Sequence, residues 1–250
     1  MTRVIKIGGR PQSDPRLAKA LAAAEKIVLV HGGGDEVSML QKMYGTTAEF
    51  RDGLRVTSET DLAIIRMALS GSANKRLVSA LVSEGVAAVG LSGEDSGLLE
   101  SDPLDPATYG FVGIPSRTNT RLIEYLLDGG YMPVISPVSR STSPETGVTL
   151  NVNGDDAAAA IAIALQASEL LLVSDVEGVR VDGITMNMLS PVDAQSLVDT
   201  GVAQGGMTAK IRAAIRALDG GVERVRISDI AAIEDLGRGT IITRAESVCT

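Results

Sequence analysis

The chain has very few of the side chains on which cysteine- and histidine-based sites depend. Its 250 residues include one cysteine, one histidine and no tryptophan. A single cysteine excludes a disulfide framework and a Cys-rich metal site, and a single histidine excludes a His-rich metal centre. We therefore interpret Cys249 as a free thiol beside the C-terminus.

Basic and aromatic surface is also scarce. The formal net charge is −8 and aromatic residues make up 2% of the chain, whereas nucleic-acid surfaces need basic patches and stacking rings. No apolar run reaches the roughly 20 residues that span a bilayer. Residues 1–6 lead directly into strand-like sequence without a secretory signal. These features argue against nucleic-acid and membrane partners and indicate a cytoplasmic protein, which can still bind anions through local N–H groups and lysines.

What the chain does contain is an alternation of short aliphatic runs with longer helical patterns. This alternation predicts an α/β fold with a mainly parallel sheet and helices on both faces. The predicted strands are Arg3–Ile7, Ile27–Val30, Ala87–Leu91, Met132–Ser136, Leu170–Ser174, Arg224–Ile227 and Thr240–Thr243. The predicted helices include Asp61–Leu69, Asn74–Ser83 and the Ala-rich run Asp156–Gln166. Ser58 and Asp61 have the spacing of a capping box.

Two stretches interrupt the alternation. Gly93–Ser116 is rich in Gly, Pro, Asp and Ser, which predicts a hairpin or a loop on the substrate side. Pro137–Gly147 is a second interruption near the middle of the chain. It is a candidate boundary between two lobes, so the chain is expected to be either one large domain or two closely packed lobes.

The second predicted strand runs through His31 into three consecutive glycines, Gly32–Gly34. Because glycine lacks Cβ, the backbone there can turn sharply and approach a ligand closely. If a helix begins at this point, its free N–H groups and the positive end of its dipole face an anion. The first strand ends similarly, with Lys6 followed by Gly8 and Gly9, and parallel strands bring both ends to one edge of the sheet. The sequence therefore predicts a phosphate or oxyanion cradle beside a lysine.

Three further segments place polar residues next to predicted helices or strands. Asn151–Asp156 introduces the Ala-rich helix: one of its side chains should cap the helix, while Asn151 can hydrogen-bond a ligand and Asp155 can orient lysines. Gly205–Lys210 places a glycine pair before a helix whose early turns carry the lysine. Ser174–Val179 joins a strand to a loop that suits a nucleotide base or ribose.

Several well-known chemistries fit the chain poorly. The P-loop sequence is absent. Gly32–Val37 approximates the dinucleotide fingerprint, but Val37 takes the place of its third glycine and the segment follows the second strand, so a nicotinamide-dependent oxidoreductase is a minor alternative. A Ser–His–Asp triad would have to use His31, whose glycine neighbours suit a general base poorly. We interpret His31 as a residue that structures the loop.

With these segments placed, the chain resembles the acetylglutamate kinases of the amino acid kinase family. The matching segments follow the family's order over nearly the whole chain: Lys6–Gly9, Val30–Gly34, Gly53–Thr57, Gly71–Lys75, Ala88–Gly93, Asn151–Asp155, Ser174–Gly178 and Gly205–Lys210. The resemblance implies a three-layer α/β/α sandwich with two lobes. Residues 1–148 would bind the acyl amino acid and form the dimer, and residues 149–250 would bind ATP. The implied reaction moves the γ-phosphoryl group of ATP to the side-chain carboxylate of N-acetyl-L-glutamate, the second step of arginine biosynthesis.

The resemblance also implies roles for individual residues. The two catalytic lysines fall on Lys6 and Lys210, and the aspartate that organises them falls on Asp155. The implied substrate contacts are Gly33, Gly34, Arg55 and Asn151. The implied nucleotide contacts are Gly8, Gly9, Asp175, Val176, Glu177, Gly178, Val179, Arg180, Val202, Ala203 and Gln204. Mg²⁺ should arrive with ATP, held mainly by phosphates and water, so no residue is assigned to a metal.

The chain departs from the family pattern at two charged positions and at its start. Arg10 stands where small or apolar residues are commoner; its charge could reach phosphate, but we expect it to point outward. Glu94 replaces a position that is often lysine. The sequence begins at its first strand, without the N-terminal helix of the arginine-inhibited hexameric members. The resemblance therefore implies a homodimer without arginine feedback, with Asp61–Leu69 or Asn74–Ser83 at its interface.

Two alternative functions remain. The first is a kinase of the same fold that acts on N-acetyl-2-aminoadipate or a related acyl amino acid. Relatives specialised for carrier-linked substrates usually depart from the Val30–Gly34 and Gly53–Thr57 forms, which are intact here. The second is a non-catalytic regulatory module that binds an amino acid. Retention of Lys6, Asp155 and Lys210 argues against this module, because loss of activity would relax all three.

Overall fold

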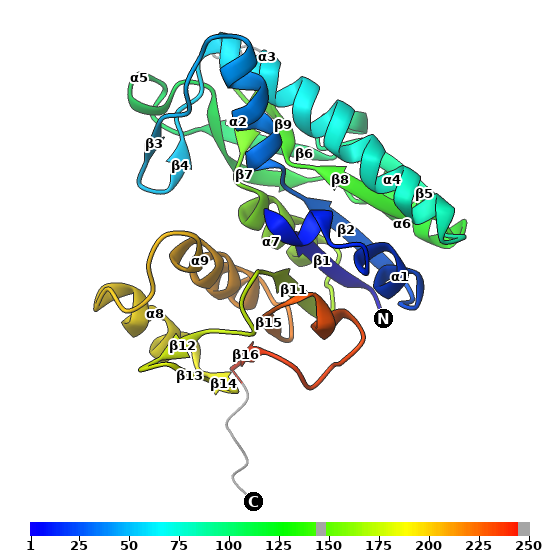
Figure 1. Ribbon diagram of the computed structural model, residues 1–250, viewed down its shortest axis with the longest axis vertical. Helices are drawn as coiled ribbons and strands as arrows, with labels where there is room; N and C mark the ends of the chain where they lie inside the picture. The colour runs from blue at the N-terminus through cyan, green and yellow to red at the C-terminus, as the bar shows by residue number, and fades with distance from the viewer. Residues whose placement is uncertain (144–148, 245–250) are drawn as a thin grey trace, which may run out of the picture.

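Eight strands form the central sheet of the computed structural model, which describes residues 1–143 and 149–244 (Figure 1). Neighbouring strands are parallel except for β15 and β16. In spatial order the strands are β14 (Met188–Leu189), β16 (Thr240–Ile242), β15 (Val225–Ser228), β11 (Glu169–Val173), β1 (Arg3–Ile7), β2 (Ile27–His31), β8 (Met132–Ser136) and β5 (Ala88–Ser92). The predicted strands are confirmed, and their ends differ from the observed ones by no more than one residue.

Both faces of this sheet are buried, and alternate residues of a strand enter different cores. Val4 and Val28 pack on one face, while Ile5 and Leu29 pack on the other. The first face is covered by α6 (Arg121–Asp128), α7 (Gly154–Ala164), α8 (Pro191–Asp199) and α9 (Gly206–Asp219). The second face is covered by α1 (Leu17–Ala22), α4 (Asn74–Ser83) and the short helix η5 (Ile230–Ile233). The predicted α/β/α sandwich is therefore confirmed.

A long helical run and the helix before it flank the carboxyl edge of the sheet. The helix α2 (Gly34–Met43) follows the glycine turn, and α3 (Glu59–Arg66) continues through the π-helical segment η2 (Met67–Ala73) into α4. The two helices predicted at Asp61–Leu69 and Asn74–Ser83 are thus parts of one run. The predicted capping box is confirmed, because Ser58 Oγ accepts from the Asp61 N–H and the Asp61 carboxylate accepts from the Ser58 N–H.

A smaller, closed sheet lies beside the central one. It consists of β6 (Leu99–Pro103), β7 (Val112–Thr118), β9 (Val138–Ser141) and β10 (Thr149–Val152). The antiparallel pair β6–β7, with the short helix α5 (Pro106–Tyr109) between its strands, confirms the hairpin predicted within Gly93–Ser116. The strand β10 leads directly into α7, so this sheet helps to place the start of that helix.

The remaining elements are short. The two-stranded hairpins are β3 (Phe50–Arg51) with β4 (Leu54–Arg55), and β12 (Arg180–Val181) with β13 (Ile184–Thr185). The 3₁₀ turns η1 (Arg10–Ser13) and η3 (Asp95–Gly97) complete the set. Across the described ranges, none of the helices has the length and apolarity that crossing a membrane requires. Cys249 and the last residues of the interruption Pro137–Gly147 lie outside the described residues.

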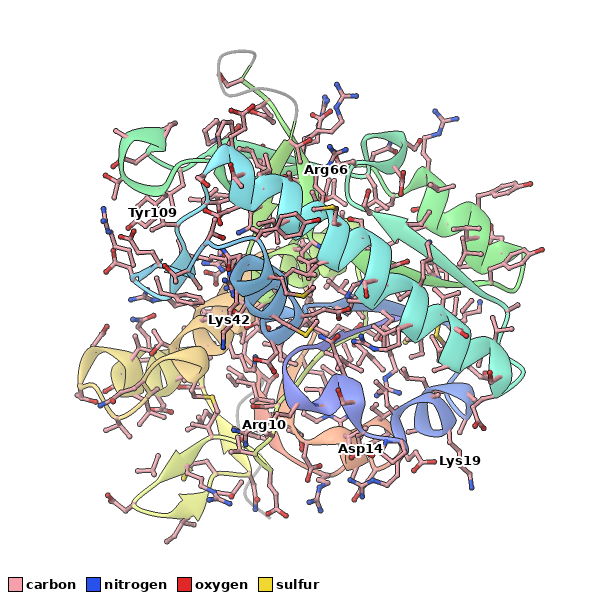
Figure 2. All side chains as sticks on the ribbon, turned by 45° about the horizontal axis from the view of Figure 1, so that its top comes forward. Arg10, Asp14, Lys19, Lys42, Arg66 and Tyr109 are labelled. Atoms are coloured by element: carbon pink, nitrogen blue, oxygen red, sulfur yellow. The ribbon has the colours of Figure 1, made fainter. Side chains whose placement is uncertain are left out.

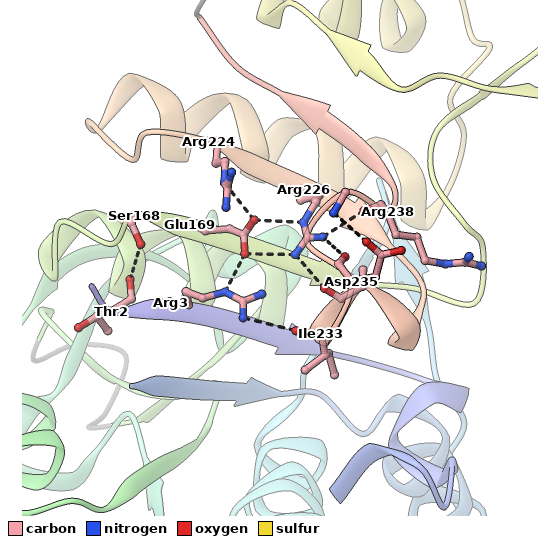
Figure 3. A network of polar contacts seen from close by, with 11 residues as sticks. Thr2, Arg3, Ser168, Glu169, Arg224, Arg226, Ile233, Asp235 and Arg238 are labelled. Atoms are coloured by element: carbon pink, nitrogen blue, oxygen red, sulfur yellow. Dashed lines mark hydrogen bonds and ion pairs between the residues drawn. The ribbon is translucent and has the colours of Figure 1, made fainter. Parts of the chain in front are cut away.

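At the amino ends of the strands, a buried ion network ties three strands together (Figure 3). Glu169 of β11 accepts from Arg3 of β1 at 2.8 Å and from Arg226 of β15 at 3.1 Å. Arg226 is fully buried and also donates to the main-chain carbonyl of Ala232. Breaking such a buried pair from one side leaves an uncompensated charge, so this network fixes the relative positions of β1, β11 and β15.

Candidate functional site

Lys6, Asp155 and Lys210 meet at the carboxyl edge of the central sheet. Lys6 is near the end of β1, Asp155 is in the first turn of α7, and Lys210 is in the second turn of α9. The Lys6 Nζ lies 2.8 Å from Asp155 Oδ1, and the Lys210 Nζ lies 3.1 Å from Asp155 Oδ2. Their exposed fractions are 7%, 4% and 9%. Residues far apart in the sequence thus form one buried cluster.

The charge balance of this cluster favours an anion. Burial alone would raise the pKa of Asp155, but the ammonium groups of Lys6 and Lys210 hold that pKa below its ordinary value. Burial and the neighbouring Lys6 lower the pKa of Lys210, although Asp155 opposes them. Two cations around one carboxylate leave a positive excess in a place with little water, and a negative phosphoryl group entering there would relieve it.

Small residues make room for this arrangement. A Cβ at Gly8 would lie 2.6 Å from the Lys6 Nζ, and one at Gly154 would lie 3.0 Å from the Lys6 Cε. Asn153 caps α7, since its Oδ1 accepts from the Asp155 N–H at 2.8 Å. The sequence-based expectation that one side chain of this segment acts as a cap is therefore confirmed.

The glycine turn Gly32–Gly34 leads into the N-terminus of α2, as predicted. Gly33 has φ of 155°, and a Cβ at this position would lie 2.7 Å from the Leu69 Cδ2. Gly34, the first residue of the helix, has more space, because its Cβ would lie 3.8 Å from the nearest atom, Arg55 Nη2. The two glycines therefore differ: Gly33 is required by its backbone conformation and packing, whereas the position of Gly34 has space for a Cβ beside Arg55.

His31 supports the glycine turn through contacts with Gly32 and Asn74. It is fully buried, its Nδ1 lies 2.8 Å from the Gly32 carbonyl oxygen, and its Nε2 lies 3.0 Å from the Asn74 Nδ2. The same Asn74 amide group donates to the Val134 carbonyl at 2.8 Å. His31 is therefore a neutral imidazole that donates through Nδ1 and accepts through Nε2. These contacts bear out its interpretation as a loop-structuring residue.

We expect His31 to make the protein less stable in mild acid. Burial lowers the pKa of His31 from 6.5 to about 4. Below pH 6.5 the unfolded chain takes up this proton while the folded chain does not, so the free energy of unfolding should fall by about 3 kcal/mol as the pH drops to 4. Urea unfolding at several pH values measures the loss. Because His31 is the sole histidine, its NMR signal is unambiguous, and a titration midpoint near 6.5 would contradict this account.

Two adjoining cavities open beside the lysine cluster. The smaller, of about 440 Å³, is lined by Gly34, Arg55 and Asn151 among others. Asn151 donates through Nδ2 to Thr57 Oγ1 at 3.0 Å. Three of the four predicted substrate residues therefore line one cavity, while Gly33 supports the turn at its edge without lining it.

The larger cavity, of about 800 Å³, contains the lysine cluster itself. Among the predicted nucleotide residues, Gly8, Gly9, Asp175 and Val176 line it. Arg10, labelled in Figure 2, is exposed but lines this cavity, so both positions considered for its charge stay open. The residues that line both cavities are Asp35, Phe50, Gly53 and Asn153. The cavities therefore adjoin, and the lysine cluster lies in the larger one close to the residues that they share.

The other predicted nucleotide residues lie further along the same loops. Glu177, Gly178 and Val179 lead into β12, of which Arg180 is the first residue, and Val202, Ala203 and Gln204 lead to the turn before α9. These seven residues are not among those that line the larger cavity. Thr240 fixes the first of the two loops, since its Oγ1 accepts from the Val179 N–H at 2.8 Å.

Two of the four residues at the junction of the cavities, Asp35 and Phe50, were not among the residues selected from the sequence. Asp35 directly follows the glycine turn, and this position beside the predicted anion cradle could have marked it as a site residue. Phe50 lies in β3, and its ring centroid is 4.7 Å from the guanidinium carbon of Arg55, a contact that the spacing of these residues does not indicate. Glu94, the second departure, pairs with Arg66 and accepts from Thr149 Oγ1, and it lines neither cavity.

A parallel sheet whose edge gathers two lysines, an aspartate and glycine turns defines a protein that handles negatively charged small molecules. The chain belongs to the amino acid kinase family, whose model matches residues 1–229. It is 43% identical over 250 residues to the acetylglutamate kinase of Chloroflexus aurantiacus (strain J-10-fl), with 97% of each chain covered. The predicted family is therefore confirmed.

Solved structures with the same fold cover nearly the whole chain. The crystal structure of smu.665 from Streptococcus mutans UA159 matches with a TM-score of 0.86 and 32% identity, covering 98% of this chain and 99% of that one. The N-acetylglutamate synthase of Neisseria gonorrhoeae, complexed with coenzyme A and N-acetyl-glutamate, matches with a TM-score of 0.81 and 31% identity. There the match covers 98% of this chain and 59% of the synthase.

Proposed function

We propose that this protein transfers the γ-phosphoryl group of ATP to the side-chain carboxylate of N-acetyl-L-glutamate, the second step of arginine biosynthesis. The observation that carries the proposal is the buried Lys6–Asp155–Lys210 cluster near the junction of two cavities. Each cavity offers room for one of two substrates that meet at the lysines. The 43% identity to an acetylglutamate kinase over nearly the full length of both chains supports the choice of substrate.

Phosphoryl transfer requires mainly positioning and charge stabilisation from the protein. Lys6 and Lys210 would neutralise charge on the oxygens of the transferring group from two sides. Asp155 binds both ammonium groups at 2.8 and 3.1 Å and would keep them at a fixed separation. The cluster is therefore assigned the catalytic role, with Asp155 as the residue that organises the lysines.

The smaller cavity would hold the acceptor. Arg55 offers a planar guanidinium to the α-carboxylate, and Asn151 offers an amide to the rest of the molecule. The N–H groups at Gly33 and Gly34 would face the acceptor carboxylate as charge passes to it. This carboxylate is already ionised at neutral pH, so the reaction needs no general base. His31 would therefore have only its structural role in the glycine turn.

The larger cavity would hold ATP. Gly8 and Gly9 would contact its phosphates, and Asp175 and Val176, which also line the cavity, would contact its base and ribose. The contacts predicted at 177–180 and 202–204 lie outside this lining and stay predictions. Both oxygens of Asp155 are engaged by lysines, which fits Mg²⁺ carried mainly by the phosphates and water. The ion would neutralise phosphate charge as transfer proceeds.

We further infer a cytoplasmic homodimer. The helical run α3–η2–α4 is the surface chosen from the sequence, and it exposes Met67 and Val82 to 48% and 54%. Exposed apolar side chains on one helical run suit an interface with a second copy. Use of ATP supports the cytoplasmic location.

An acceptor panel tests the proposed function. We expect acyl phosphate, trapped with hydroxylamine as a hydroxamate, only when ATP and Mg²⁺ are both present, with N-acetyl-L-glutamate giving the highest kcat/KM. N-acetyl-2-aminoadipate should react more slowly, because its longer chain shifts the acceptor carboxylate relative to the lysines. Equal or faster reaction of aminoadipate would overturn the substrate assignment. Absence of product with every acceptor would favour the regulatory module.

A further inference from the structure

The surroundings of Arg55 point to a residue that prepares it for substrate. We propose that Gln41 is a positioning residue, which fixes the guanidinium of Arg55 for the α-carboxylate of the acceptor. The inference rests on the proposed function, since it assigns a task to the site that binds the acyl amino acid. Gln41 lies in α2 and lines neither cavity.

The guanidinium is held at several points. Arg55 Nη1 donates to Gln41 Oε1, and Nη2 donates to Ser38 Oγ at 3.0 Å and to the Gly34 carbonyl at 3.2 Å. The Phe50 ring covers one side of the group. Arg55 is half-buried and lines the smaller cavity. The contacts with α2 thus aim an otherwise flexible side chain.

Gln41 is itself fixed from the far side. It is 1% exposed, and its Nε2 donates to Asp61 Oδ1 at 2.5 Å. Asp61 is the carboxylate of the capping box on α3, and its pKa is lowered: although burial raises it, hydrogen bonds from Ser58 and Gln41 prevail. Hydrogen bonds from Arg55 to Gln41 and from Gln41 to Asp61 therefore link the substrate cavity to the start of α3.

Only an amide satisfies both neighbours. Arg55 can only donate hydrogen bonds and ionised Asp61 can only accept them, so the amide oxygen must face Arg55 and the amide nitrogen must face Asp61. A carboxylate in place of Gln41 would form an ion pair with Arg55 and compete with the substrate. The neutral amide orients the guanidinium while leaving its charge available to the α-carboxylate.

The variant Gln41→Leu tests this role. Its apolar side chain removes the acceptor for Arg55. Loss of a hydrogen bond to a charged group corresponds to roughly a 10- to 100-fold change in an equilibrium constant, here the affinity for the acceptor. We expect KM for N-acetyl-L-glutamate to rise by about tenfold or more, with kcat changed less than about threefold and KM for ATP unchanged. Gln195→Leu is the matched control, because Gln195 of α8 also donates to an aspartate, Asp199, at 2.7 Å, but this hydrogen bond is exposed.

A second acceptor separates positioning from a general structural effect. The compound 4-acetamidobutanoate is N-acetylglutamate without the α-carboxylate, so it cannot use Arg55 in the proposed way. Gln41→Leu should leave its kcat/KM within about twofold of the unmodified protein. In an Arg55→Lys background, Gln41→Leu should add little further loss for N-acetyl-L-glutamate, because residues that act together are not additive.

Several outcomes would overturn the inference. These are an unchanged KM for N-acetyl-L-glutamate, an equal loss with both acceptors, or fully multiplicative effects of the two substitutions. If Gln41→Leu does not fold, Gln41→Met keeps the length of the side chain and removes the same hydrogen bonds, and it should raise KM for N-acetyl-L-glutamate but not for 4-acetamidobutanoate. Failure of the unmodified protein to phosphorylate N-acetyl-L-glutamate would instead reject the proposed function.

Discussion

Replacing Lys210 with methionine is expected to lower kcat by about a thousandfold, the size of effect seen when a charge-stabilising group is removed from a phosphoryl-transfer or oxyanion site. Methionine keeps much of the length and the apolar stem of lysine but carries no charge. The phosphoryl oxygens would then meet a cation from one side only, while Lys6 and Asp155 would still form a neutral pair. The fold should therefore survive, and the loss should appear in the chemical step.

Steady-state rates with saturating ATP and N-acetyl-L-glutamate measure this effect, together with circular dichroism to confirm folding. Lys6→Met should give a loss of the same order. Lys19→Met is the control, because Lys19 is a lysine on α1, away from both cavities (Figure 2). A Lys210→Met protein with a kcat within tenfold of the unmodified enzyme would refute the assigned role of Lys210.

Substituting alanine for Gly33 should reduce kcat by about a hundredfold or more, because it displaces N–H groups aimed at the reacting carboxylate. The added Cβ would approach Leu69 Cδ2 to 2.7 Å, and φ of 155° is rarely adopted by residues that have a Cβ. Relief of that contact requires the turn to move. The affinity for ATP should change far less, because the turn serves the reaction centre.

Gly34→Ala is the matched comparison, since its Cβ would lie 3.8 Å from the nearest atom. We expect it to retain much more activity than Gly33→Ala, whereas valine at either position should lower kcat more than it weakens ATP binding. Measuring both turnover and the equilibrium binding of ATP distinguishes a slower reaction from weaker ATP binding. If Gly33→Ala weakened only the binding of ATP, the turn would serve the nucleotide site and not the reaction centre, and our assignment would be wrong.

The central sheet could be predicted from sequence because its strands are buried on both faces. Runs such as Ile27–His31 and Glu169–Val173 are almost wholly apolar, and short apolar runs that alternate with helices are typical of the buried strands of a parallel sheet. The smaller sheet gave no comparable signal. Its strands β9 and β10 read Val-Ser-Arg-Ser and Thr-Leu-Asn-Val, which are too short and polar to mark a strand without their neighbours.

The candidate site was predictable to the extent that strand ends and helix starts define it. Lys6 and the glycine turns lie where parallel strands must end together, and Asp155 and Lys210 lie in the early turns of predicted helices. The family resemblance supplied the specific roles of the two lysines and the aspartate. The position of Gln41 could not be inferred in this way. Its partners Arg55 and Asp61 lie 14 and 20 residues away in sequence, on a hairpin and a helix whose relative placement depends on tertiary packing.

The strand β1 has a consequence for how the two proposed regions of this protein can vary. All five of its residues pair with β2 on one side and with β11 on the other, so the proposed acceptor and ATP regions share a strand that also carries Lys6. Separating them would leave two long, unpaired strand edges, which promote association with other chains. Neither half could therefore be inherited, exchanged or duplicated as an independent module without a new partner for its edge.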